Sequence, residues 1–177
     1  MSNMSGKALL ALGSNRAHDG LSGPALLSEA VRQIDAAHLF VSARSSVWES
    51  PPWPPDHDTT RGQANYFNAI VACEVGDRAP DDVVAILQMI ERKFGRTRRV
   101  RWEARTLDLD LIDLDGRVGD FNDVILPHPH AHERAFVLSP LAEVAPGWRH
   151  PILGKTAAQL LSDLPGQEET CRIAALA

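Results

Sequence analysis

Two aspartates lie two residues apart at the end of a stretch that is rich in arginine. The stretch Gly95 to Leu111 reads GRTRRVRWEARTLDLDL, and in its second half Asp108 and Asp110 alternate with leucines. Alternate side chains of a β-strand point to opposite faces, so the leucines would face the core and the two carboxylates would stand together on the other face. A pair of carboxylates beside guanidinium groups suits a polyphosphate and its divalent cation. A solvated polar strand face, paired with the arginines, is the alternative.

The first half of this stretch has no helix or strand period and is predicted to be a loop. It carries five arginines, which are Arg96, Arg98, Arg99, Arg101 and Arg105. Phosphoryl transfer needs positioning and charge stabilisation, which guanidinium groups supply, and such a loop would swing in after a nucleotide has bound. The sequence contains neither GxxxxGK[ST] nor the HRD and DFG motifs of protein kinases, so neither usual ATP fold applies.

His128 lies between two prolines, and Arg134 follows six residues later. The imidazole could donate a hydrogen bond to a phosphate, and the arginine favours that role. The alternative for a lone histidine is a structural role in a rigid turn, because proline fixes φ and restricts the residue before it.

Composition favours one compact domain. The chain has 177 residues, 44% of them hydrophobic, and a net charge of −5, which does not suit nonspecific nucleic-acid binding. Seven of its 18 basic residues nevertheless fall between Arg92 and Arg105, so the positive charge is local, as a site requires. The apolar run Ala8–Leu12 is too short for a signal peptide or a membrane span. We therefore expect a soluble, cytoplasmic protein that binds neither nucleic acid nor a membrane.

Hydrophobic periodicity predicts strands and helices in an interspersed order. The expected strands are Lys7–Leu12, Leu39–Trp48, Tyr66–Val75 and Thr106–Asp113, with a hairpin turn at Asp115-Gly116 leading to a short strand near Val118. The expected helices are Pro24–Ala37, Pro80–Phe94, Ala131–Val144 with a break near Ser139-Pro140, and Thr156–Leu164 with Thr156 as N-cap. This order predicts an α+β sandwich in which helices pack on one face of a largely antiparallel sheet.

Three further features could contribute to a site, and each has a simpler alternative. The loop Ser50–Ala64 has four prolines within five positions, and its Trp53 either anchors the loop to the core or closes over a ligand. Asn68 interrupts an apolar strand, where its amide either reads the edge of a heterocycle or satisfies a neighbouring loop; Tyr66 shares its face. Gly13 ends the first strand and either permits close approach to the backbone or simply makes a turn.

With these residues in hand, the sequence resembles the 6-hydroxymethyl-7,8-dihydropterin pyrophosphokinase family of folate biosynthesis. Seven blocks occur in the right order between about Ala8 and Pro146. They are LGSN at Leu12–Asn15, SPPW at Ser50–Trp53, YFNA at Tyr66–Ala69, IE with GRTR at Ile90–Arg98, RWEARTLDLDL at Arg101–Leu111, LPHP at Leu126–Pro129, and RAFVLSPL at Arg134–Leu141. The resemblance implies a ferredoxin-like α+β fold and one domain over residues 1–177, with a core of about 7–146 and a short extension, 147–177.

The resemblance also implies a Mg-dependent pyrophosphokinase that transfers the pyrophosphoryl group of ATP to the hydroxymethyl group of the reduced pterin and releases AMP. Asp108 and Asp110 would bind two Mg²⁺ ions, and Arg98 and Arg105 would steady the transferring phosphates. The implied pterin-binding residues are Gly13, Ser50, Pro51, Trp53, Tyr66, Asn68 and Phe136. The implied nucleotide contacts are Glu91, Arg96, Trp102, Leu111, His128 and Arg134. We expect a monomer or a weak dimer.

The sequence departs from the family pattern at Glu103-Ala104, where Gly-Pro is usual, and in the length of the loop Ser50–Ala64. Both departures bear on how the loops close. The alternative function is a catalytically silent protein that binds a pterin or a nucleotide on the same fold. The retained aspartates and arginines argue against that alternative.

Overall fold

The structure is a computed structural model that describes residues 6–54, 58–95, 104–165 and 170–177. Within these residues the main sheet has six strands and a separate sheet has two. The strands are β1 (Gly6–Ser14), β2 (Phe40–Arg44), β3 (Ser46–Ser50), β4 (Tyr66–Gly76), β5 (Asp108–Leu114), β6 (Gly119–Phe121), β7 (Val124–Leu126) and β8 (Cys171–Ala175). The helices are α1 (Gly23–Ala36), α2 (Pro80–Lys93), the 3₁₀ turn η1 (Ala131–Glu133), α3 (Ala135–Val144) and α4 (Ala157–Asp163).

The main sheet is antiparallel throughout and has the order β5-β1-β4-β3-β8, with β2 also paired to β4. The α+β, ferredoxin-like class is confirmed. Within the described residues no helix has the length and apolar character needed to cross a membrane.

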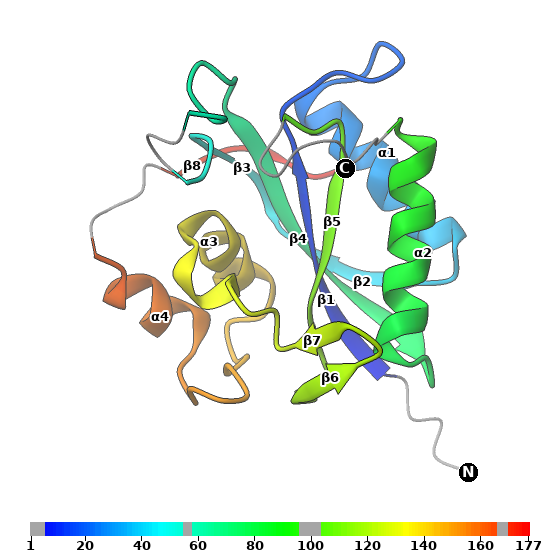
Figure 1. Ribbon diagram of the computed structural model, residues 1–177, viewed down its shortest axis with the longest axis vertical. Coiled ribbons are helices and arrows are strands. Elements are labelled where there is room, and N and C mark those ends of the chain that lie inside the picture. The colour runs from blue at the N-terminus through cyan, green and yellow to red at the C-terminus, as the bar shows by residue number, and fades with distance from the viewer. Residues whose placement is uncertain (1–5, 55–57, 96–103, 166–169) are drawn as a thin grey trace.

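Helices cover both faces of this sheet, so the expectation of helices on one face is wrong. Leu10 and Leu12 of β1 pack in the same cluster as residues of α1 and α2, whereas Leu9 packs with residues of α3 and α4. Figure 1 shows the sheet between these two pairs of helices. The physical reason is visible in β1, where ALLAL is apolar at both parities, the pattern of a strand that is buried on both faces.

The strand predicted over 39–48 is divided into β2 and β3 at Ser45. The Ser45 N–H donates to the Ile70 carbonyl at 2.9 Å, and its Oγ accepts from the Ile70 N–H at 2.9 Å. The side chain therefore replaces a ladder bond, and both strands stay paired with β4 through an irregularity in register.

The predicted turn at Asp115-Gly116 is present, but the hairpin pairing is wrong. Both residues have positive φ, 52° and 67°, and the Arg117 N–H donates to the Leu114 carbonyl at 3.0 Å. The chain then continues to β6, which pairs with β7 in the small sheet rather than with β5. Val118 precedes β6 and lies outside it.

The last two predicted helices are present with changed limits, and the predicted break near Ser139-Pro140 is wrong. The break falls at Arg134, whose extended backbone (φ −122°, ψ 109°) separates η1 from α3, while Pro140 lies inside α3. Thr156 caps α4 as expected, because its Oγ1 accepts from the Gln159 N–H and its own N–H donates to the Gln159 side chain. Strand β8 was not predicted, since a single short segment carries no clear alternation.

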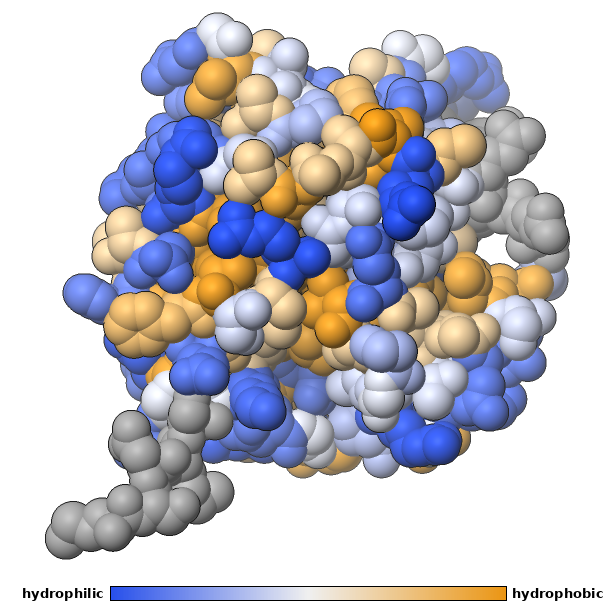
Figure 2. Space-filling model, turned by 180° about the vertical axis from the view of Figure 1, so that it is seen from behind, coloured by the Kyte–Doolittle hydropathy of each residue, from blue (hydrophilic) through white to orange (hydrophobic). Residues whose placement is uncertain are grey.

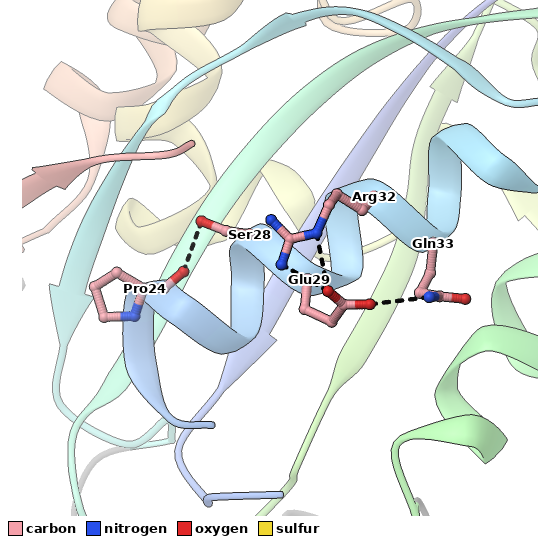
Figure 3. A network of polar contacts seen from close by, with 5 residues as sticks. All are labelled: Pro24, Ser28, Glu29, Arg32 and Gln33. Atoms are coloured by element: carbon pink, nitrogen blue, oxygen red, sulfur yellow. Dashed lines mark hydrogen bonds and ion pairs between the residues drawn. The ribbon is translucent and has the colours of Figure 1, made fainter. Parts of the chain in front are cut away.

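The outer surface is polar or mixed. On α1, Glu29 accepts hydrogen bonds from Arg32 and Gln33, and Ser28 donates to the Pro24 carbonyl (Figure 3). Seen from behind, the molecule shows apolar areas interrupted by polar side chains (Figure 2). The exposed large apolar side chains are spread over several elements.

Candidate active site

The end of β1 and the starts of β4 and β5 meet at one end of the main sheet, the upper end in Figure 1. In the strand register Gly13 of β1 lies between Asn68 of β4 and Asp108 of β5. A Cβ placed on Gly13 would lie 3.5 Å from the Asn68 Oδ1 and 3.9 Å from the Asp108 Cβ. The missing side chain therefore leaves an open strip of backbone between a buried amide and an acidic pair.

The acidic pair has the predicted arrangement. Leu109 and Leu111 are each 5% exposed on the core face, whereas Asp108 and Asp110 are half-buried on the other face. Asp108 forms an ion pair with Arg105. Burial and the neighbouring Asp108 carboxylate raise the pKa of Asp110 from 3.8 to about 7. Two carboxylates that share a buried site are expected to show this effect, because one of them then holds its proton more tightly.

Glu91 of α2 fixes the strand that carries this pair. It is 3% exposed, and its Oε1 accepts a hydrogen bond from the Leu109 N–H at 2.7 Å. Leu109 lies between the two aspartates, so the contact sets the position of β5 where the carboxylates project. The nucleotide contact implied for Glu91 stays a prediction, beside this structural contact.

The amide of Asn68 is buried and partly satisfied by the protein. Its Nδ2 donates to the Ser50 Oγ at 2.9 Å, and both residues are at most 5% exposed. Ser50 ends β3 and pairs with Tyr66 at the start of β4. The Asn68 Oδ1 faces the backbone of Gly13, so an acceptor borders the open strip.

Arg134 lies over two of the predicted pterin residues. Its guanidinium carbon is 4.7 Å from the centroid of the Trp53 ring and 5.8 Å from that of Phe136. Its Nε is buried and has no hydrogen-bond partner among the described residues. Burial lowers the pKa of Arg134, and Asp110 and Asp108 oppose that shift. Trp53 thus contacts the N-cap residue of α3, and this contact connects the proline-rich loop to the site.

His128 is neutral and oriented. Burial, then Arg134, lowers its pKa from 6.5 to about 4. Its Nδ1 accepts the His130 N–H at 3.2 Å, so its Nε2 carries the proton. Its own N–H donates to the Ile112 carbonyl of β5 at 2.9 Å. The ring is therefore a fixed neutral donor beside the acidic strand.

Not every implied residue joins this cluster. Leu111 packs in the core on the face of α1 and α2. Pro51 is exposed. Three of the implied residues lie outside the described residues, and these are Arg96, Arg98 and Trp102. Asn15 was missed as a site residue, although it directly follows Gly13-Ser14 in the predicted motif.

The residues present fit magnesium better than a metal that needs a full protein cage. Within the described ranges no group of three or more His, Cys, Asp or Glu side chains could hold an ion. Two carboxylates alone suit Mg²⁺, which keeps water and substrate phosphate oxygens as its other ligands.

The structure has a ferredoxin-like α+β fold, and its candidate site sets an acidic pair, Asp108 and Asp110, beside the buried amide of Asn68. The model of the 7,8-dihydro-6-hydroxymethylpterin-pyrophosphokinase (HPPK) family matches residues 9–146. The chain belongs to this family.

Curated relatives agree over most of the chain. The 2-amino-4-hydroxy-6-hydroxymethyldihydropteridine pyrophosphokinase of Synechocystis sp. is 37% identical over 160 residues, which cover 89% of this chain and 75% of that protein. The protein of the same name from Methylorubrum extorquens is 36% identical over 159 residues, covering 89% and 93%.

A solved structure supports the fold. The HPPK-DHPS of Plasmodium falciparum matches with a TM-score of 0.63 and 12% identity, over 90% of this chain. The match spans only 44% of that longer chain, so the likeness concerns one part of it.

Proposed function

We propose that this protein transfers the pyrophosphoryl group of ATP to the hydroxymethyl group of 6-hydroxymethyl-7,8-dihydropterin. The hydroxyl oxygen would attack the β-phosphorus of ATP while the bond to the α,β-bridging oxygen breaks, giving AMP and the pterin diphosphate with loss of the hydroxyl proton. Membership of the HPPK family supports this activity. The observation that carries it is the register that sets Gly13 between Asn68 and Asp108, because a buried amide able to bind the edge of a heterocycle then lies beside two carboxylates able to bind a cation.

The chain's own residues divide the work. Asn68 and Ser50 offer an amide and a hydroxyl to the edge of the pterin, and Phe136 offers a ring for stacking. Arg105 has its guanidinium at the acidic pair, where it can contact a phosphate. The Nε2–H of His128 can donate to a phosphate oxygen without adding a charge that titrates near neutral pH. Arg134 can leave the aromatic rings and contact a phosphate when a ligand enters.

We further propose that Asp108 and Asp110 bind Mg²⁺, two ions arriving with ATP. In such sites the cation neutralises phosphate charge and orients the transferring group. We also propose that the chain works as one domain, because β8 of the extension pairs with β3 of the core. A cytoplasmic location and a monomeric or weakly dimeric state stay predictions.

The test is one assay. The protein is mixed with ATP, magnesium and the reduced hydroxymethylpterin, and AMP formation is followed. AMP with pterin diphosphate is the expected result. ADP would indicate an ordinary kinase and would overturn the proposal. Binding of either ligand without any product would favour the alternative, a catalytically silent binding protein.

We predict that magnesium binding releases a proton near pH 6.5. The folded-state pKa of Asp110, about 7, lies above its ordinary 3.8, so between these values the folded protein holds a proton that the unfolded chain has lost. This contribution to stability is present below about pH 4 and is lost as the pH rises toward 7, where Mg²⁺ takes the ionised carboxylate instead. Calorimetry in two buffers of different ionisation enthalpy measures the release. Asp110→Asn should abolish it; unchanged release would contradict the assignment.

We predict that Gly13→Ala weakens pterin binding without destabilising the fold. The new Cβ makes ordinary contacts at 3.5 and 3.9 Å, and the lost backbone freedom of glycine favours the folded state by up to about 1 kcal/mol. The methyl group occupies the open strip, so the Kd of the pterin should rise about tenfold, and further with Gly13→Val. Thermal melting and calorimetric titration separate the two effects. Unchanged affinity in both variants would remove Gly13 from the pterin site.

A further inference from the structure

The segment that follows β1 is bonded to the end of the arginine-rich stretch. The Asn15 N–H donates to the Arg105 carbonyl at 3.0 Å, and the Arg16 N–H donates to the same carbonyl at 3.2 Å. The Arg105 N–H in turn donates to the Asn15 Oδ1 at 2.8 Å. Both backbone groups of Arg105 are therefore held by residues that directly follow the open strip at Gly13.

The same segment contacts the residues before the arginine-rich stretch. The His18 Nε2 lies 3.2 Å from the Lys93 carbonyl, and its ring lies 5.8 Å from the Phe94 ring. A Cβ on Gly95 would lie 3.1 Å from the His18 ring, so the backbone approaches closely there. Residues on both sides of 96–103 thus rest on the chain that follows β1.

The side chain of Asn15 also reaches the proline-rich loop. Its Nδ2 donates to the Gln63 Oε1 at 3.2 Å and to the Ala64 carbonyl at 3.1 Å. Gln63 donates to the Thr59 carbonyl at 2.7 Å. The Thr60 Oγ1 donates to the carbonyl of Pro54, the neighbour of Trp53, at 2.9 Å. The Asn15 Oδ1 thus accepts from the loop that bears Arg105, whereas its Nδ2 donates to the proline-rich loop.

We infer that Asn15 is a positioning residue that couples the loop bearing Arg105 to the loop bearing Trp53. This inference rests on the proposed function, in which one loop contacts the phosphates and the other contacts the pterin. The relative placement of the two loops then sets the approach of the hydroxyl to the phosphorus. A misplacement of about 1 Å can lower a rate roughly 100-fold. Only an amide of this length supplies both the acceptor and the donors that the two loops use.

Steady-state kinetics test the coupling. Asn15→Ala is expected to lower kcat roughly 10- to 100-fold and to change the KM for ATP less than about threefold, because the positions of the reacting groups change more than the ground-state contacts. Gln63→Ala should lower kcat less, and the double variant should match Asn15→Ala alone. The matched control is Asn65→Ala. The Asn65 side chain is exposed at the same end of the loop, and its Nδ2 donates to the Glu49 Oε1 at 3.1 Å. This variant should retain wild-type kcat. Additive effects in the double variant, or an equal loss in Asn65→Ala, would overturn the inference.

Hydrogen exchange gives a second readout that needs no activity. In Asn15→Ala without added ligand, the amide of Arg105 and the amides of residues 58–64 should all exchange faster than in the wild type. In Asn65→Ala the exchange of the Arg105 amide should not change. Asn15→Asp keeps the acceptor and lacks the donors, so it should affect residues 58–64 and spare Arg105. If the wild type forms no AMP, the proposed function fails while this experiment still tests the coupling. If exchange in Asn15→Ala matches the wild type, the coupling fails even in an active enzyme.

Discussion

Asp108→Ala is expected to lower kcat about 1,000-fold or more while the Kd of the pterin stays within about threefold. The variant removes one of two carboxylates that would bind magnesium, and a loss of about 4 kcal/mol of transition-state stabilisation corresponds to that factor. Asn68 and Ser50, the proposed pterin residues, bond to each other, so their geometry should be preserved. Turnover assays and calorimetric titration measure the two quantities.

The matched control for this variant is Asp163→Ala. Asp163 is an exposed carboxylate that pairs with Lys155 at 2.8 Å, and surface pairs of this kind contribute little. Wild-type kcat is expected for the control. Retained activity in Asp108→Ala would show that the metal assignment is wrong, and a parallel loss of pterin affinity would show that the two halves of the site are not separable.

Glu91→Ala is expected to lower the free energy of unfolding by about 1–3 kcal/mol, because it leaves the buried Leu109 N–H without its acceptor. The kcat should fall as well, because the part of β5 between the two aspartates is then no longer held by Glu91. Glu91→Gln keeps an acceptor in place and should retain most of the stability. Urea unfolding and turnover assays check these results.

The same glutamine variant tests the electrostatics. The Glu91 charge contributes to raising the pKa of Asp110, after burial and Asp108, so Glu91→Gln should move that pKa downward. The pH at which magnesium binding releases a proton should shift in the same direction. Equal destabilisation by alanine and glutamine would mean that the charge of Glu91, and not its hydrogen bond, supports the strand.

The alternation of residues 107–111 was sufficient to predict both the strand and its two faces. Leucine and aspartate differ strongly in the free energy of burial, so only one orientation of the strand buries the leucines and leaves the aspartates on the other face. The same reasoning could not predict that β1 is covered on both sides, because apolar residues at both parities do not say which helices cover them. It also could not place β6 against β7, since a turn fixes local geometry and not the final partner.

Strand alternation was enough to predict where the aspartate pair and the buried amide of Asn68 lie, whereas their roles stay predictions. Arg134 shows the limit of such reasoning. The resemblance implied a phosphate contact, and the structure shows in addition that the guanidinium lies over Trp53 and Phe136. No local pattern reveals that contact, because it depends on a loop and a helix that are far apart in the chain. The coupling role of Asn15 was missed for the same reason.

The pairing of β8 with β3 has a consequence for how this protein is made. Ser50 lies at the end of β3, whose second neighbour, Cys171–Ala175, is synthesised much later than β4. During translation β3 therefore remains the edge of an incomplete sheet, with unpaired backbone groups beside Ser50. We expect chaperones to recognise this edge on nascent chains, and the protein to acquire ligand-binding competence only after the β8 segment has left the ribosome.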